Sequence, residues 1–349
     1  MSGSPHSEHK VTMNILFLGG NSGTAGHRAG ALRRLGHTVH QVDPDQMIPA
    51  GRFQARLHWE TGALLCEKSV AAQVLASLGE AKFDLTWVDN GRSVGPILVR
   101  ELQRRHGPVV NYNVDDPYGR RDRLAWSLYK KAVPAYNLVV VVREENVAEA
   151  NALGAKKVLR VYRSADEVAH APRALTDADH ARWDSEVVFV GTHFPERGPF
   201  MAELIRRGVP LTIYGNQWQK AKEWPVLQQA WKGPGTTQDD DYAKAIQCAK
   251  VSLGLLSKGN RDLHTTRSLE VPSLGAVFCA ERTSEHLYLY CEGEEAVFWS
   301  DAAECADACL KLLAGDGLRR QIARLGRERC LRNGTMNEQV VAHVLSYVA

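Results

Sequence analysis

The sequence predicts an α/β protein with two doubly wound domains, in which helices cover both faces of a parallel sheet. Short apolar runs alternate with helical stretches along most of the chain, and this order is typical of a parallel sheet. The alternation lapses once near the middle and then starts again. The chain has 349 residues, of which 44% are hydrophobic and 24% charged, enough for two globular domains of ordinary size.

The first series begins after Met13 with an apolar run that ends in glycine, a helical stretch at 25–35 and a β-branched run at 37–43. This order predicts a βαβ opening. We expect further strands at 84–88, 108–112, 138–142 and 157–161. Helices are expected at 94–105, 121–133 and 144–153.

A second series predicts the other sheet. We expect strands at 187–191, 211–215, 251–256 and 275–280, with helices at 198–207, 240–249 and 266–273. Three tail helices are expected at 301–313, 316–333 and 336–348. The predicted division is a disordered leader at 1–12, a first domain at 13–165, a linker at 166–185, a second domain at 186–333 and a terminal helix at 334–349.

Composition narrows the classes of function. Lysine and arginine together number 43 against 40 aspartates and glutamates, so bulk charge gives no reason to expect nucleic acid as a partner. The seven cysteines form no C-x-x-C motif, which is typical of a reduced, cytoplasmic protein. No window approaches the roughly 18 to 20 apolar residues that span a bilayer. The acidic runs at 43–45 and 239–241 resemble metal-binding clusters, but acids are favoured at helix starts, and we expect no metal site.

The segment 263–281 is the most informative in the chain. It places Glu270 one turn inside a predicted helix, eight residues after Asp262, with two threonines and an arginine between them. Amides at a helix N-terminus attract phosphate, and a carboxylate one turn further can accept hydrogen bonds from sugar hydroxyls. This layout predicts a nucleotide-sugar site.

The acidic pair resembles the Glu-x7-Glu pair of GT-B glycosyltransferases, with Asp262 in the first position and Glu270 in the second. The chain also resembles the CgeB-like group, which is named for a spore-maturation protein. That similarity rests on 259–275 and on FVGTHFPERGPF at 189–200, IYGNQW at 213–218, NYNVDDP at 111–117 and the spacing from Ala165-Asp166 to His170.

The resemblance implies a GT-B fold, with two Rossmann-like domains facing across a cleft and a terminal helix that crosses back to the first domain. It implies a hexosyltransferase-like enzyme that moves a sugar from a nucleotide-diphosphate sugar, such as a UDP-sugar, to a hydroxyl of a glycan, lipid-linked or protein acceptor. Such transfer belongs to polysaccharide or glycoconjugate biosynthesis. We expect retention of the anomeric configuration and no cofactor besides the donor.

Most donor-binding residues are expected in the second domain. The loop that contains Arg197 follows a strand where parallel sheets bind phosphate, and a guanidinium there can neutralise a diphosphate without losing its charge. Glu270 is expected to hold the ribose and Asp262 to lie near the sugar. The other donor-side candidates are Gly191, Thr192, Gly215, Asn216, Lys258, Arg261, Thr265, Thr266 and Arg267.

The glycine-rich loop at 19–30 is the main candidate for the acceptor side, because glycine allows close approach to a ligand. A dinucleotide could bind the same loop, with Asp43 in the position of a ribose-binding acid, although a strict G-x-G-x-x-G is missing. A tight turn without function is the third interpretation. The acceptor-side candidates are Gly20, Asn21, Gly23 and His27.

Asp115 and Asp116 follow a predicted strand, so at least one of them should project from its carboxyl end. Such a carboxylate could take a proton from an acceptor hydroxyl, orient the donor sugar, or only cap a turn. An inverting reaction would need a base, for which these two acids and His27 are the candidates.

The basic segment 120–131 carries Leu124 and Trp126 on a predicted helix and could rest on an anionic membrane at its inner face, bind an acidic acceptor, or cover the core. Other functions also stay open at this stage. They are a sugar-nucleotide epimerase of GT-B shape, an NAD-dependent Rossmann oxidoreductase, and a non-catalytic sugar-nucleotide-binding protein.

Overall fold

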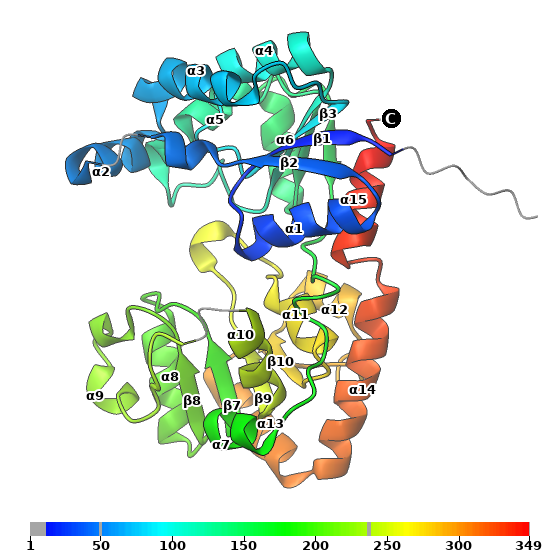
Figure 1. Cartoon of the computed structure of the whole chain (residues 1–349). Helices are drawn as coiled ribbons and strands as arrows, with labels where there is room; N and C mark the ends of the chain where they lie inside the picture. Colours follow the sequence, from blue (N-terminus) through cyan, green and yellow to red (C-terminus); the bar gives the residue numbers. More distant parts are fainter. Residues whose placement is uncertain (1–11, 49–50, 236–238, 349) are drawn as a thin grey trace, which may run out of the picture. The chain divides into compact units, whose positions relative to one another are not determined.

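The computed structural model describes residues 12–48, 51–235 and 239–348. The chain divides into two compact units, one made of residues 1–160 and 341–349 and the other of residues 161–340 (Figure 1). The predicted leader at 1–12 lies outside the described residues except for Thr12. The segment predicted as a linker, 166–185, contains helix α7 (Asp177–Trp183) and belongs to the second unit.

Unit 1 is built on a six-stranded sheet with the order β2-β1-β3-β4-β5-β6, in which all neighbouring strands are parallel. The central strands β3 and β4 are buried along their whole length, which explains their continuous apolar character. The strands are β1 (Asn14–Leu18), β2 (Thr38–Val42), β3 (Leu85–Asp89), β4 (Val109–Asn113), β5 (Leu138–Val141) and β6 (Val158–Arg160).

Helices pack on one face of the sheet of unit 1 through an apolar core. Leu16 and Val88 of the strands share this core with Val74 of α3 and Leu98 of α4. The helices are α1 (Gly23–Arg34), α2 (Arg52–Thr61), α3 (Glu67–Leu78), α4 (Pro96–His106), α5 (Ser127–Ala132) and α6 (Glu144–Ala152). The sequence patterns did not predict α2 and α3.

The continuous helix predicted at 121–133 is wrong. A 3-10 turn at Arg123–Trp126 precedes the short α5, and Arg123 has a positive φ of 46°, which an α-helix does not tolerate. Trp126 is buried, whereas Leu124 is 65% exposed. No helix in the described ranges is long and apolar enough to cross a membrane. Peripheral membrane contact of this basic segment stays a prediction.

In unit 1 the order in which the chain adds strands to the sheet reverses at β1, between β1 and β3. Strand β1 pairs with β2 on one side and with β3 on the other, so the loops that follow β1 and β3 diverge at the carboxyl edge of the sheet. Ligands of doubly wound sheets bind at such a switch point. The glycine-rich loop after β1 therefore lies where a ligand site is expected.

Unit 2 contains a five-stranded parallel sheet with the order β11-β10-β9-β7-β8. The strands are β7 (Ser185–Val190), β8 (Leu211–Tyr214), β9 (Ala249–Gly254), β10 (Phe278–Glu281) and β11 (Val297–Trp299). The three residues of β11 were not predicted. The switch point lies between β7 and β9, because β7 pairs with β8 on its other edge.

The two faces of this sheet bury different residues of the same strand. Val187 and Phe189 of β7 pack into a core with α8 and α13, whereas Val188 and Val190 pack into a core with α10 and α11. The helices of unit 2 besides α7 are α8 (Arg197–Arg206), α9 (Trp224–Leu227), α10 (Asp239–Gln247), α11 (Arg267–Ser273), α12 (Ser284–Leu289), α13 (Ala302–Ala314) and α14 (Asp316–Arg332).

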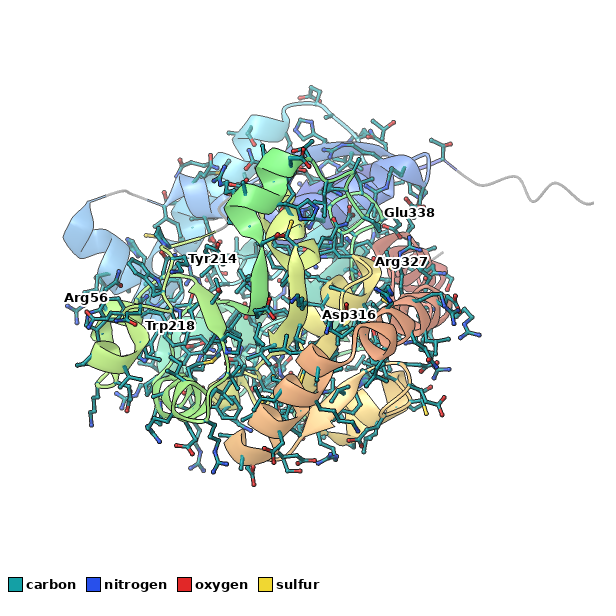
Figure 2. All side chains as sticks on the ribbon, turned by 90° about the horizontal axis from the view of Figure 1, so that it is seen from below. Arg56, Tyr214, Trp218, Asp316, Arg327 and Glu338 are labelled. Atoms are coloured by element: carbon teal, nitrogen blue, oxygen red, sulfur yellow. The ribbon has the colours of Figure 1, made fainter. Side chains whose placement is uncertain are left out.

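The tail of the chain is helical as predicted, with α13 and α14 followed by α15 (Asn337–Ser346). Arg327 of α14, labelled in Figure 2, donates a hydrogen bond from Nε to the carbonyl of Ser273 at 3.1 Å and so ties α14 to the end of α11. The division between the units at residue 340 falls inside α15.

Candidate functional site

Arg197 occupies the switch point of unit 2. It is the first residue of α8, and its side chain is only 7% exposed. One terminal nitrogen, Nη1, donates to the carbonyl of Thr192 at 2.7 Å, and the other, Nη2, donates to the carbonyl of Leu256 at 3.2 Å. These bonds join the loop after β7 to the loop after β9, so Arg197 lies where a doubly wound sheet binds phosphate.

The charge of Arg197 is poorly compensated. Its hydrogen-bond partners are carbonyl oxygens rather than carboxylates, and its Nε is buried without a hydrogen-bond partner among the described residues. Burial, followed by repulsion from Arg267, lowers the pKa of Arg197 to about 10, so it still carries a positive charge at neutral pH. A buried cation of this kind attracts an anionic ligand.

The loop after β7, which contains Thr192, is interlocked with the loop after β8 at two glycines. A Cβ on Gly215 would lie 2.0 Å from the carbonyl oxygen of Gly191, and the φ of Gly215 is +143°, so only glycine fits. The indole Nε1 of Trp218 donates to the same carbonyl at 2.9 Å, and the His193 amide donates to the carbonyl of Asn216 at 2.9 Å. Figure 2 labels Trp218 beside the end of β8. The loops therefore form a fixed backbone platform.

Glu270 is held by two side chains from outside its helix. It lies in the first turn of α11 and is 6% exposed. The hydroxyl of Tyr242 donates to its Oε2 at 2.8 Å, and Nε2 of His170 lies 3.5 Å from its Oε1. Burial alone would raise the pKa of Glu270, but His170 and Arg267 outweigh it, so the pKa lies below its usual value and the group is a carboxylate at neutral pH.

The spacing from Asp166 to His170 has a structural explanation. The backbone N–H of Asp166 donates to Nδ1 of His170 at 2.8 Å, and the other ring nitrogen, Nε2, faces Glu270. The Asp166 carboxylate accepts from the amides of Val168 and Ala169 and from Nδ2 of Asn337. This turn orients the imidazole toward Glu270, a role that spacing alone did not reveal.

Several other donor-side candidates already have partners. The carboxylate of Asp262 accepts from Nη2 of Arg163 at 3.0 Å, and Lys258 forms an ion pair with Glu281. Arg267 donates from Nε to the carbonyl of Val190, the last residue of β7, at 3.2 Å. The structure therefore brings Arg267 to the strand end that precedes the Arg197 loop.

The remaining candidates lie on the same loops. The amide of Thr265 donates to the hydroxyl of Ser268 at 3.0 Å, and the carbonyl of Thr266 accepts the amides of Leu269 and Glu270. Some of the backbone N–H groups at the start of α11 therefore already donate to acceptors within the same segment. Gly191, Thr192 and Arg261 are partly exposed, and Asn216 is exposed. The ligand roles of all these residues stay predictions.

Unit 1 contains a pocket of about 600 Å³ at its own switch point. The wall includes the start of α1, the residues that follow β3 and β4, the 3-10 turn before α5, and Trp59 of α2. Its polar residues include Ser22, Thr24, Asn90, Asp115 and Asp122. A volume of this size fits a sugar or another small molecule.

The pocket contains some of the acceptor-side candidates and leaves others out. Gly23 is among the residues of its wall, whereas Gly20, Asn21 and His27 are not. The wall also includes Asp115, which was predicted as a catalytic candidate. Asp116 is 3% exposed and accepts at Oδ1 from Nδ2 of Asn146 at 3.0 Å and from the amide of Gly119 at 3.1 Å, which is a turn-capping arrangement.

Two side chains that were not predicted shape the pocket wall. Arg28, next to His27, donates from Nε and Nη2 to the carboxylate of Asp89 at 2.6 and 2.8 Å. This buried pair joins α1 to the end of β3. Asn90 has a positive φ of 64° and donates from Nδ2 to Asp115 Oδ2 at 2.7 Å, which fixes that carboxylate.

Among the residues that the structure describes, two groups could hold a metal ion by their ligand types. The thiols of Cys279, Cys305 and Cys309 are buried and converge within 4.8 Å, and a second group at His180, Asp184 and Cys248 is partly exposed. Neither group includes Arg197, Glu270 or one of the side chains described above as their partners. The acidic run at 239–241 is engaged in ion pairs, of which Arg173 with Asp240 at 2.9 Å is one.

Comparison with protein families supports this architecture. Residues 197–345 match the family model described as glycosyl transferase-like. Over these residues the chain is similar to glycosyl transferase-like proteins. The predicted family and the predicted enzyme class, a glycosyltransferase, are confirmed at this level. No curated protein sequence matches the chain.

Solved structures of similar fold cover nearly the whole chain. Sucrose-phosphate synthase from Thermosynechococcus elongatus has a TM-score of 0.69 at 13% identity, covering 96% of this chain and 98% of that one. Anabaena HepE in complex with UDP-glucose has a TM-score of 0.67 at 14% identity, with 96% and 100% coverage. Trehalose 6-phosphate synthase from Burkholderia multivorans has a TM-score of 0.61 at 11% identity, with 97% and 100% coverage. The predicted GT-B fold is confirmed.

Proposed function

We propose that this glycosyltransferase moves a hexose from a UDP-sugar to a hydroxyl acceptor, without a metal ion and with retention of the anomeric configuration. The observation that carries the proposal is the buried guanidinium of Arg197, whose partners are carbonyl oxygens rather than carboxylates. A diphosphate would supply the negatively charged hydrogen-bond partner that this guanidinium lacks. Anabaena HepE, which shares the fold, was solved with UDP-glucose.

The second positive charge supports the same ligand. Arg267 lies close enough to Arg197 to lower its pKa, and it is anchored at the end of β7 by the Val190 carbonyl. Two guanidinium groups held at one switch point match the two phosphates of a nucleotide diphosphate in charge. Fixed cations would also stabilise the charge that develops on the leaving diphosphate, and this substitutes for a metal ion.

Glu270 supplies the complementary hydrogen-bond acceptor. Its carboxylate is ionised and immobilised by Tyr242 and His170, so it can accept hydrogen bonds from the two hydroxyls of a ribose. Asp262, eight residues earlier and buried against Arg163, is the candidate for the sugar hydroxyls. This division of roles follows the acidic-pair pattern that the sequence predicts.

The transfer itself needs few protein groups. The acceptor oxygen bonds to the anomeric carbon as the bond from that carbon to the phosphate oxygen breaks, and the leaving oxygen takes the acceptor proton. Retention results when attack and departure occur on the same face of the sugar. Arg197 stabilises the leaving group, and Asp115 in the pocket of unit 1 orients the acceptor hydroxyl.

A ligand panel tests the proposal. Thermal unfolding of the full chain should shift upward with UDP and UDP-hexoses, because a ligand stabilises the state that binds it, and should not shift with NAD. Release of UDP from the donor, measured with and without a chelator, tests turnover and independence of metal. The coupling constant of the product's anomeric proton reports retention or inversion.

The outcomes separate the alternatives. A shift with NAD alone would contradict the proposal in favour of an oxidoreductase. Conversion of the UDP-sugar to its epimer, without transfer, would identify an epimerase. Binding of UDP-hexoses without release of UDP across an acceptor panel would identify a non-catalytic binding protein.

A further inference from the structure

The charged residues that line the pocket of unit 1 indicate which charge its ligand can carry. Three arginines line it, and each is matched by an aspartate that also lines it. The pairs are Arg28 with Asp89 at 2.6 Å, Arg121 with Asp122 at 2.8 Å and Arg92 with Asp45 at 3.9 Å. Each arginine of the wall is therefore already paired with a carboxylate of the same wall.

A fourth carboxylate in the wall has no matching arginine there. Asp115 accepts a hydrogen bond from the neutral amide of Asn90 at 2.7 Å, and its backbone carbonyl accepts one from Nη1 of Arg143 at 2.7 Å. With three arginines and four aspartates, the wall has a formal excess of one negative charge. A phosphate or carboxylate in this pocket would face repulsion rather than a cation.

The buried pair cannot easily turn to a ligand. The side chains of Arg28 and Asp89 are each 4% exposed and joined by two hydrogen bonds. A phosphate that recruited Arg28 would leave Asp89 buried without its partner, which is strongly unfavourable. Arg28 therefore stabilises the wall and is a poor anion receptor.

Aromatic surface completes the wall. Trp59 is 59% exposed, and the guanidinium of Arg92 lies over its ring at 3.9 Å from the centroid, which leaves the other face uncovered by Arg92. The negative face of an indole attracts the polarised C–H groups of a sugar ring, as it attracts other positive edges. Trp126 contributes a second ring and is fixed by its Nε1 bond to Asp122 at 3.3 Å.

We propose that this pocket binds an uncharged sugar as the acceptor, with its ring against Trp59 and a hydroxyl at Asp115, and that it excludes phosphorylated sugars. The inference rests on the proposed function and adds the chemical class of the acceptor. A sugar offers the hydroxyls that carboxylates and amides bind and the apolar ring face that tryptophan binds. It brings no charge that the wall would have to neutralise.

Calorimetric titration of the full chain saturated with UDP tests the inference. The probes are the methyl glycosides of glucose, galactose, mannose and N-acetylglucosamine, each beside the 6-phosphate of the same sugar. We expect at least one neutral glycoside to bind about tenfold or more tightly than its phosphate. Trp59→Ala should weaken that binding about tenfold, whereas the control Leu65→Ala, at a residue that is 70% exposed and outside the pocket wall, should not.

A charge variant gives a second readout. Asp115→Asn should narrow the preference for the neutral sugar severalfold, because it removes the excess negative charge. Phosphates that bind as tightly as the neutral glycosides, or neutral binding that Trp59→Ala leaves intact, would overturn the inference. If no probe binds while UDP does, the acceptor inference fails and the donor half of the proposed function stands. If UDP itself does not bind, the proposed function fails.

Discussion

Replacing Arg197 by methionine should weaken UDP binding and have only a limited effect on the free energy of unfolding. Burial lowers the pKa of this guanidinium to about 10, and since one pKa unit is worth about 1.4 kcal/mol, the charge costs the free protein about 3 kcal/mol. Methionine removes that cost but also removes the hydrogen bonds of two charged guanidinium nitrogens to carbonyl oxygens, at roughly 1.5–3 kcal/mol for each nitrogen. The first effect offsets most of the second, so the free energy of unfolding should fall by about 3 kcal/mol at most.

UDP binding should weaken with the same change. A hydrogen bond to a charged group contributes roughly 1.5–3 kcal/mol, so the dissociation constant of UDP should rise about 10- to 150-fold. Urea unfolding of the free protein and calorimetric titration with UDP measure the two effects. Arg206→Met is the matched control, because that arginine lies in the same helix and pairs with Glu203 at the surface. A large loss of stability with unchanged UDP affinity would refute a ligand role for Arg197.

Three further predictions follow from the geometry. Glu270→Gln should weaken UDP binding about tenfold in calorimetry and UMP binding equally, because the ribose is common to both; unchanged affinity would exclude ribose contact. Gly215→Ala should abolish UDP-induced thermal stabilisation, since its Cβ would meet a carbonyl oxygen at 2.0 Å, whereas Gly208→Ala, with nothing within 4 Å, should keep it. Burial lowers the pKa of His286 to about 4, below the unfolded value of about 6.5, so its contribution to stability is complete above pH 6.5 and lost as the pH falls toward 4. Urea unfolding at pH 7 and 4.5 should show a smaller difference for His286→Asn than for the natural protein, and an equal difference would contradict this.

Sequence patterns predicted the strands of both sheets well because buried parallel strands are continuous apolar runs. Strand β11 was missed because its three residues, Val297–Trp299, are too few to form a pattern. The helix at 121–133 was wrong because its apolar spacing is helical, whereas the backbone at Arg123 turns into a positive φ. The periodicity of apolar residues does not reveal that one residue within the segment has a positive φ.

For the candidate sites, too, local features could be predicted from the sequence and contacts between distant segments could not. Arg197 and Glu270 could be selected because each stands at a fixed place in a strand–loop–helix unit. Their partners could not, because the Leu256 carbonyl and the Tyr242 hydroxyl come from distant segments. Arg28 was missed for the same reason, since its pairing with Asp89 spans 61 residues.

The central proposal is that the guanidinium groups of Arg197 and Arg267 in unit 2 bind the diphosphate of a sugar nucleotide. Calorimetric titration of the full chain with UDP, UMP and uridine tests it most directly, because the three ligands differ only in phosphate. UDP should bind at least tenfold more tightly than UMP, and Arg197→Met should remove most of that difference. Equal affinities for UDP and uridine, or a preference for UDP that survives Arg197→Met unchanged, would contradict the claim.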